Sequence, residues 1–229
     1  MSREQSVSTT LRAALIATLV SAFLTGCIFS PDKKTIDTGG GAPDIVKTPQ
    51  DLIQVLAESY RTRDIVLFSS LLANDPDNNA EYLFILDPAA GADDEQWGYD
   101  LETRIHQRMF EPQNTPPGQA PVPAEFWLTS ITITLTRSTP FTERTDLYFD
   151  ATNNPTGLSK DKWYVSDAIF ATDVLFDTQG DLDFQVTGRA NFVVVEDLTK
   201  TIGDAGKFLI LQWNDLGTNK PSPVAEMPS

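Results

Sequence analysis

The most constraining feature of this chain is a strict alternation of side-chain type between residues 181 and 194. Every even position in the segment carries an apolar or small residue, and every odd position from Asp181 to Asn191 carries a polar one. Because successive side chains of a β-strand point to opposite faces of a sheet, the pattern predicts a long strand with one buried and one solvated face. The chain must therefore supply neighbouring strands and a second layer that covers the apolar face.

The segments before residue 127 follow a helical period instead. Thr48 stands before a proline and close to an acidic residue, as expected of a helix N-cap. The period predicts one helix after Thr48, a shorter one within IVLFSSLLAND (65–75) and a third over YDLETRIHQRMF (99–110), with Leu101, Ile105 and Met109 as its apolar face. YLFILD (82–87) is interpreted as a short strand.

From Trp127 onwards the period is two residues, which predicts further strands. They cover residues 131–135, a short segment at 147–149, residues 163–176 with a β-bulge near Asp167 or Asp173, and KFLILQWNDL (207–216). Helices followed by an antiparallel sheet place the chain in the α+β class.

The N-terminus has the composition of a secretory signal. Arg3 and Arg12 precede an uncharged apolar run over residues 13–24. A membrane-spanning helix needs about 20 apolar residues, so this run is too short for a permanent span.

The end of the run, LTGC, resembles the bacterial lipobox and contains the only cysteine of the chain. Leu24, Thr25 and Gly26 precede Cys27, which the resemblance implies is lipidated and becomes the mature N-terminus. Two or three acyl chains would hold the protein firmly on a membrane, because one chain alone binds only marginally. Ile28 stands where an aspartate would favour the inner membrane, so outer-membrane localisation is expected.

Four regions are expected along the chain. Residues 1–26 form the signal peptide, residues 27–47 a lipidated N-terminus and flexible tether, and residues 218–229 a disordered tail. Residues 48–217 form a single α+β domain. The hydrophobic content of the whole chain, 41%, supports a core, which must hold without disulfides because Cys27 is the only thiol.

The charge balance limits the partners. Without residues 1–26 the chain keeps 15 of its 17 basic residues and 31 of its 32 acidic residues, a net charge of 15 − 31 = −16. Such a surface repels phosphate backbones, so nucleic acid is not expected as a partner. Membrane contact is expected through the acyl chains, since anionic headgroups offer no attraction.

The order of elements resembles the nuclear transport factor two-like superfamily, whose cone-shaped fold is shared with ketosteroid isomerases and polyketide cyclases. The resemblance covers roughly residues 48–217 and is carried by ESYRTRD (58–64), LFSSLLAND (67–75) and WNDL (213–216). It implies N-terminal helices packed on a strongly curved antiparallel sheet, around an interior that is either a ligand pocket or a filled core. No family catalytic residue can be carried over to a position of this chain.

Few residues are candidates for catalysis or for metal binding. His106, the only histidine, follows Glu102 by four residues and is interpreted as part of a solvated pair on the third helix. DPDNNAE (75–81) begins like a calcium loop but lacks its glycine and its closing glutamate. Asp167 and Asp173 are the only acids of the sheet that could point inward, and the acids around residues 173–183 could at most hold a cation weakly. No metal, cofactor or catalytic site is therefore predicted.

Two functions remain open from the sequence. The first is a lipid-anchored envelope protein with a non-catalytic binding domain, and the second is a small cone-fold enzyme, such as an isomerase, hydratase or cyclase, acting on an apolar molecule. A water-accessible cavity with a convergent polar group would favour the enzyme. Val193 and Val195 interrupt the polar face of the long strand, which suggests a homodimer or an envelope-protein contact there.

Overall fold

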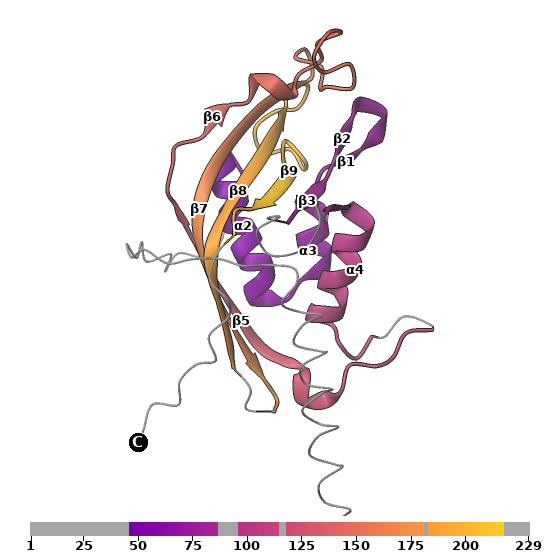
Figure 1. Cartoon of the computed structure of the whole chain (residues 1–229), viewed down its shortest axis with the longest axis vertical. Coiled ribbons are helices and arrows are strands. Elements are labelled where there is room, and N and C mark those ends of the chain that lie inside the picture. Colours follow the sequence, from indigo (N-terminus) through magenta and orange to yellow (C-terminus); the bar gives the residue numbers. More distant parts are fainter. Residues whose placement is uncertain (1–45, 87–95, 115–117, 181–182, 218–229) are drawn as a thin grey trace, which may run out of the picture.

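The computed structural model describes residues 46–86, 96–114, 118–180 and 183–217 (Figure 1). In this part of the chain, three α-helices accompany a curved sheet and a small separate hairpin. The helices are α2 (Pro49–Thr62), α3 (Ile65–Ser70) and α4 (Tyr99–Phe110). The hairpin is β1 (Asn74–Asp75) with β2 (Ala80–Glu81), and the sheet contains β3 (Leu83–Ile85), β4 (Gln96–Gly98), β5 (Leu128–Arg137), β6 (Thr142–Glu143), β7 (Trp163–Thr178), β8 (Phe184–Asp197) and β9 (Phe208–Asp215). None of the described helices has the length and apolar composition needed to cross a membrane.

The helices begin where the sequence predicts. The Thr48 side chain accepts a hydrogen bond from the backbone N–H of Asp51 at 3.1 Å, and the Asp51 carboxylate accepts one from the N–H of Thr48 at 3.0 Å. This reciprocal capping box satisfies two backbone donors that the helix itself leaves unpaired. Asp64 caps α3 with a single bond, in which its carboxylate accepts from the N–H of Leu67 at 2.8 Å. The two helices are therefore separated by a turn centred on Arg63.

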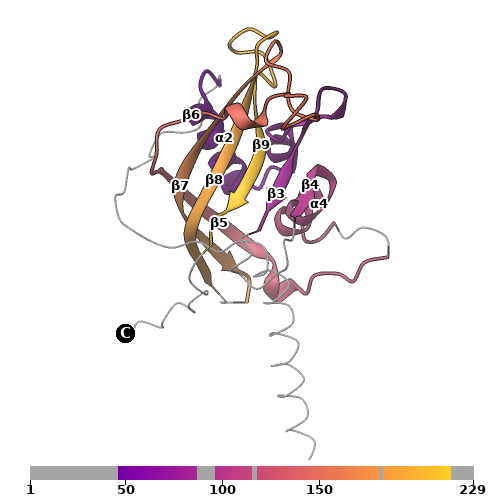
Figure 2. The ribbon, with the colours of Figure 1, turned by 45° about the horizontal axis from the view of Figure 1, so that its top comes forward.

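The sheet is strongly curved, and the helices lie on its concave side (Figures 1 and 2). Its strand order is β4-β3-β9-β8-β7-β5, with β6 beside β7. All pairings are antiparallel except that of β3 with β9, which is parallel. The fold class is thus α+β, with helices packed on a cone-like sheet. The parallel pair arises because β3 comes from the helical half of the chain and joins the edge of the later meander.

The concave side holds the main hydrophobic core. The alternation predicted for β8 is confirmed, because Val186, Ala190, Phe192 and Val194 are buried on this side. Phe192 contacts the rings of Phe170 and Trp213, with centroid separations of 5.5 and 4.8 Å. The helices complete this core with a second set of buried side chains: Leu52, Ile53, Leu56, Tyr60, Phe68 and Phe110.

A second, smaller core lies on the opposite face of the sheet. Trp163 and Val165 of β7 and Val193 and Val195 of β8 pack there. Tyr148 and Leu158, from the segment that precedes β7, cover them, and the Tyr148 hydroxyl accepts a hydrogen bond from the N–H of Val165 at 3.0 Å. Both valines of β8 are 0% exposed. The expectation that they form an exposed contact for a second copy is therefore wrong, because the chain covers them itself.

This second core also explains the irregular pattern of β7. A bulge near Asp167 or Asp173 was expected because no single alternation fits residues 163–176, but β7 pairs with β8 without interruption from Trp163 opposite Asp197 to Phe176 opposite Phe184. At the start of the strand Trp163 and Val165 are buried in the second core, and further along Ala168 and Phe170 are buried in the main core on the other face. The buried face therefore changes along β7 without a bulge. The register shifts lie elsewhere, between Val193 and Val194 against β9 and between Leu128 and Ser130 against β7.

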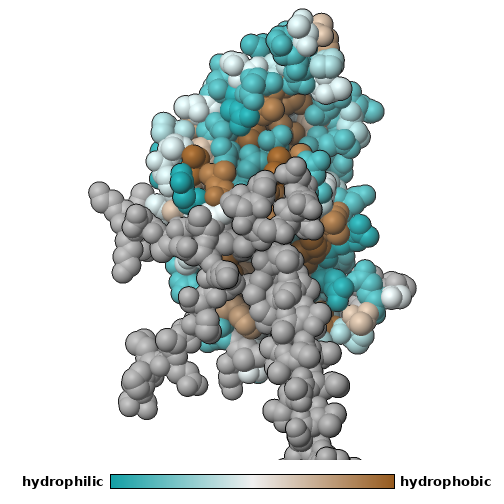
Figure 3. Space-filling model, viewed as in Figure 1, coloured by the Kyte–Doolittle hydropathy of each residue, from teal (hydrophilic) through white to brown (hydrophobic). Residues whose placement is uncertain are grey.

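The segment at 147–149 is not the short strand expected. Residues Thr145–Leu147 form a 3-10 turn, and Tyr148 makes a single bridge to Leu158. On the side shown in Figure 3, hydrophilic surface is interrupted by hydrophobic patches, over the upper strands as well as around helices α3 and α4. Those helices carry the exposed Val66, Leu101 and Ile105.

Candidate functional site

Helix α4 buries a different face from the one that the sequence predicts. Glu102 and His106 are buried, with 2% and 6% of their surface exposed, whereas Leu101 and Ile105 are 42% and 40% exposed. The solvated Glu–His pair is therefore wrong. An alternative stripe at helical spacing, Tyr99, Glu102, His106 and Phe110, faces the interior. The aromatic residues Tyr99 and Phe110 were the sequence signal for this buried face. The aliphatic Leu101 and Ile105 indicated the other face instead.

His106 lies in an aromatic enclosure. Its ring stacks on Phe68 with centroids 3.9 Å apart, and Tyr60 and Phe110 meet it edge-on at 5.3 and 5.5 Å. The Nδ1 atom lies 3.1 Å from the backbone carbonyl of Glu102, which can only accept, so Nδ1 carries the proton. The neutral ring then accepts at Nε2 from the Tyr60 hydroxyl, 2.5 Å away. Both ring nitrogens are thus used within the fold.

Glu102 is held by different partners. The indole Nε1–H of Trp97 donates to Oε2. Burial raises the pKa of Glu102 to about 7, against the opposite effects of Trp97 and of the neighbouring Tyr82 hydroxyl. Burial likewise lowers the pKa of His106 to about 4. The Nδ1 atom of His106 lies 3.5 Å from the side-chain oxygen Oε1 of Glu102.

The two shifts mean that the pair is neutral in the fold at mildly acidic pH. Free in water, a glutamate and a histidine would be oppositely charged between pH 4.5 and 6.5. In the fold the carboxyl group keeps its proton and the imidazole lacks one over that range, because the enclosure disfavours both charged forms. The contact is therefore a packed neutral pair rather than an ion pair.

The sheet acids considered from the sequence do not point inward. Asp167 accepts hydrogen bonds from Arg144, Thr142 and Asn191 on the outer side of the sheet. Asp173 is exposed and accepts from the side chain of Gln185 at 2.9 Å. Two other acids are buried on the concave side: Glu102 of α4, and Asp215 of β9, which pairs with the core residue Ala190.

The remaining acidic segments have ordinary partners. DPDNNAE forms the β1–β2 hairpin and its 3-10 turn, where Asp75 accepts from Lys162 Nζ at 2.7 Å. Asp177 accepts from the Ser130 hydroxyl. Within the described ranges, no three histidine, cysteine or acidic side chains come close enough to hold a metal ion. Leu24, Thr25, Gly26 and Cys27 lie outside the described residues.

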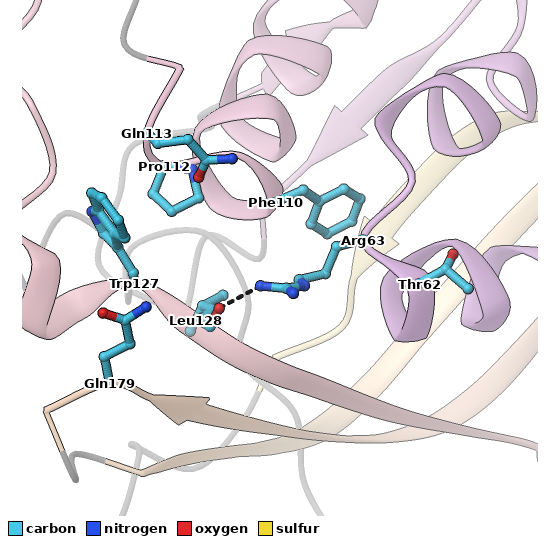
Figure 4. Close-up of a pocket in the computed structure, with 8 residues that line it drawn as sticks. All are labelled: Thr62, Arg63, Phe110, Pro112, Gln113, Trp127, Leu128 and Gln179. Carbon is cyan, nitrogen blue, oxygen red and sulfur yellow. Dashed lines mark hydrogen bonds between the residues drawn. The ribbon is translucent and has the colours of Figure 1, made fainter.

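A pocket of about 260 Å³ lies at the end of the cone, beyond Phe110. It is formed where the C-terminal ends of α2 and α4 meet the start of β5 and the turn after β7 (Figure 4). Neither Glu102 nor His106 lines it. The lining residues, which the sequence analysis did not identify, are Thr62, Arg63, Phe110, Pro112, Gln113, Trp127, Leu128 and Gln179.

Comparison with known proteins shows similarity in structure but not in sequence. No family model and no curated protein matches the chain. A conserved protein from Planctomyces limnophilus is 8% identical, covers 76% of this chain and 94% of its own, and has a TM-score of 0.46. A nuclear transport factor 2 (NTF2-like) superfamily protein from Salmonella enterica is 13% identical over 78% and 93% of the two chains (TM-score 0.40). A putative dehydratase of the NTF2-like family from Streptomyces avermitilis is 11% identical over 76% and 91% (TM-score 0.41).

Proposed function

We propose that this chain is a lipid-anchored protein of the bacterial cell envelope, favouring the outer membrane, and that its domain is a non-catalytic binding module of the nuclear transport factor two-like type. The LTGC motif supports the anchor, and the order of elements supports the fold type. The observation that carries the binding function is the enclosure of Glu102 and His106, the pair best suited to acid–base chemistry. Another envelope protein remains a proposed partner, and the homodimer remains a prediction without a defined surface.

The closure of the interior is what disfavours catalysis. Tyr60, Phe68 and Phe110 surround His106 and are each less than 5% exposed. A general acid or base must come within hydrogen-bond reach of its substrate, directly or through one water molecule. In this fold the imidazole nitrogens bond to Tyr60 and to the backbone of Glu102 instead.

One observation favours the alternative of a cone-fold enzyme. Perturbed pKa values of neighbouring groups are common in active sites, and Glu102 and His106 have shifts in opposite directions. Buried structural pairs produce the same shifts, so access to solvent is what separates the two functions. An enzyme would need a path from the interior to the surface, and the described pocket ends at Phe110.

A test of access can use the single histidine. In the full chain labelled with ¹³C-histidine, we expect the His106 Cε1–H signal to show no titration near pH 6.5 and to begin titrating only near pH 4, because burial disfavours the imidazolium. Diethylpyrocarbonate should modify His106 slowly in the folded protein and rapidly in urea. Ordinary titration near pH 6.5 together with fast modification of the folded protein would favour the enzyme.

A second test concerns the anchor. Cys27→Ala should abolish incorporation of a fatty-acid analogue and processing by the lipoprotein signal peptidase, because the chain has no other thiol. Ser30→Ala, three residues away, serves as a matched control and should be labelled normally. Labelling of the Cys27→Ala protein would show that the lipoprotein assignment is wrong and would leave the assignment of the binding domain unchanged.

A further inference from the structure

Arg63 is the charged residue of the pocket at the end of the cone. The other lining residues are uncharged. Within the described residues, no carboxylate lies within ion-pair distance of Arg63. Arg104, Arg108, Arg137 and Arg189 also have no ion pair there, but they do not line the pocket. In a chain with a net charge of −15, a half-buried cation that faces a pocket without a carboxylate partner calls for an explanation.

The backbone at Arg63 adds to this observation. The residue ends α2 in the left-handed conformation, with φ at 53°. Glycine is the usual residue at this position, because a Cβ atom makes the left-handed conformation unfavourable. The conformation directs the side chain across the pocket, where one guanidinium N–H donates to the backbone carbonyl of Leu128 at 2.5 Å. That bond holds the planar group in place (Figure 4).

The walls of the pocket are suited to an apolar body beside an anionic group. Phe110 and Trp127 present ring surface, and Pro112 adds an apolar edge. The Trp127 indole is fixed by a hydrogen bond from Nε1–H to the carbonyl of Val122 at 2.8 Å. Figure 4 shows the amide groups of Gln113 and Gln179 at separate edges of the pocket, Gln113 beside Pro112 and Gln179 below Trp127.

We propose that this pocket binds a small organic carboxylate. The carboxylate contacts the guanidinium of Arg63, whose fork of N–H donors matches two oxygen atoms, and the body of the ligand packs against Trp127 and Phe110. This assignment rests on the proposed binding function and names its ligand class. Because the chain as a whole is negatively charged, an anion needs a local cation, which Arg63 supplies in this pocket.

Benzoate and its uncharged isostere benzamide test the proposal on the full chain. With ¹⁵N-tryptophan labelling, benzoate should shift the Trp127 indole signal saturably, and benzamide should bind at least tenfold more weakly. Trp127→Phe assigns the signal. Arg63→Gln should weaken benzoate binding about tenfold or more, as expected when a charge-assisted hydrogen bond is lost. Arg137→Gln, an exposed cation on the same strand as Leu128, is the matched control and should bind normally.

The outcomes separate the ligand class from the binding function. Two results would overturn the carboxylate assignment while leaving the pocket a binding site. One is equal affinity for benzoate and benzamide, and the other is an Arg63→Gln protein whose affinity for benzoate is within twofold of the wild-type value. The absence of any saturable shift with benzoate would also overturn it. Arg63 also bonds to Leu128, so the substitution could affect folding. The indole signals of the buried Trp163 and Trp213 report whether the Arg63→Gln protein is folded. Arg63→Lys, which keeps the charge without the fork of N–H donors, should retain part of the affinity.

Discussion

Replacing Glu102 by glutamine is expected to stabilise the fold relative to the wild type as the pH rises. The pKa of Glu102 is raised from 4.5 to about 7, so the folded state holds a proton that the unfolded state has lost between these values. Wild-type stability therefore falls over this window through Glu102, by about 3 kcal/mol in total. Glutamine does not titrate, so the difference in unfolding free energy should move by about 3 kcal/mol in favour of Glu102→Gln between pH 4.5 and pH 7.

His106 produces the opposite dependence. Its pKa is lowered from 6.5 to about 4, so the unfolded state holds the extra proton and stability rises with pH between 4 and 6.5. In the wild type the two slopes cancel between pH 4.5 and 6.5, and stability should be nearly constant there. Glu102→Gln removes one slope and should leave a rise of about 3 kcal/mol from pH 4 to pH 6.5.

Urea denaturation across this range measures both effects. His106→Gln is the reciprocal control, because it should leave only the Glu102 slope, a fall in stability from pH 4.5 to pH 7. A wild-type protein whose stability changes steeply between pH 4.5 and 6.5, or a Glu102→Gln protein with the same flat profile as the wild type, would contradict the neutral pair and point to a charged one.

Phe192→Ala should lower the unfolding free energy by about 3–5 kcal/mol, the cost of truncating a buried phenylalanine and leaving a cavity. Phe192 is 0% exposed and packs between Phe170 and Trp213 at the centre of the main core. Those two residues belong to the neighbouring strands β7 and β9. The cavity could be filled only if strands of one continuous sheet moved, so we expect the full cost of truncation. Urea denaturation at neutral pH measures the loss.

Two control variants separate the faces of β8. Asp183→Ala alters an exposed side chain directly before β8, in phase with the polar face, and should change stability by less than about 0.5 kcal/mol. Val193→Ala lies on that same face but within the second core, and it should cost about 1–3 kcal/mol. A Val193→Ala effect as small as that of Asp183→Ala would show that residues 144–162 do not seal the outer face in solution.

The sequence was sufficient to predict the features that depend only on neighbouring residues. The capping pattern at Thr48 located the start of α2, because the capping box involves only neighbouring residues. The alternation of β8 identified its core face, because one side of that strand is covered and the other is wet over most of its length. Together these elements specified an α+β domain with helices preceding a curved sheet.

Only the tertiary structure showed which segments are covered on more than one side. Strand β7 and the end of β8 lie between two cores, and the covering side chains Tyr148 and Leu158 come from a segment whose local pattern predicted something else. The same reason accounts for α4. Its side with Leu101 and Ile105 looked like the core face, but Phe68, Tyr82 and Trp97, from three other elements or turns, enclose the side with Glu102 and His106.

The candidate sites show the same division. The sequence by itself determined which chemical groups were available: one histidine, one cysteine in LTGC, and a strong excess of acid. Only the tertiary structure decided that the histidine is sealed inside the fold and that Arg63 faces a pocket without a carboxylate partner among the described residues. The physical reason is that solvation and pairing of a charged group depend on neighbours far away along the chain, which Leu128, 65 residues after Arg63, illustrates.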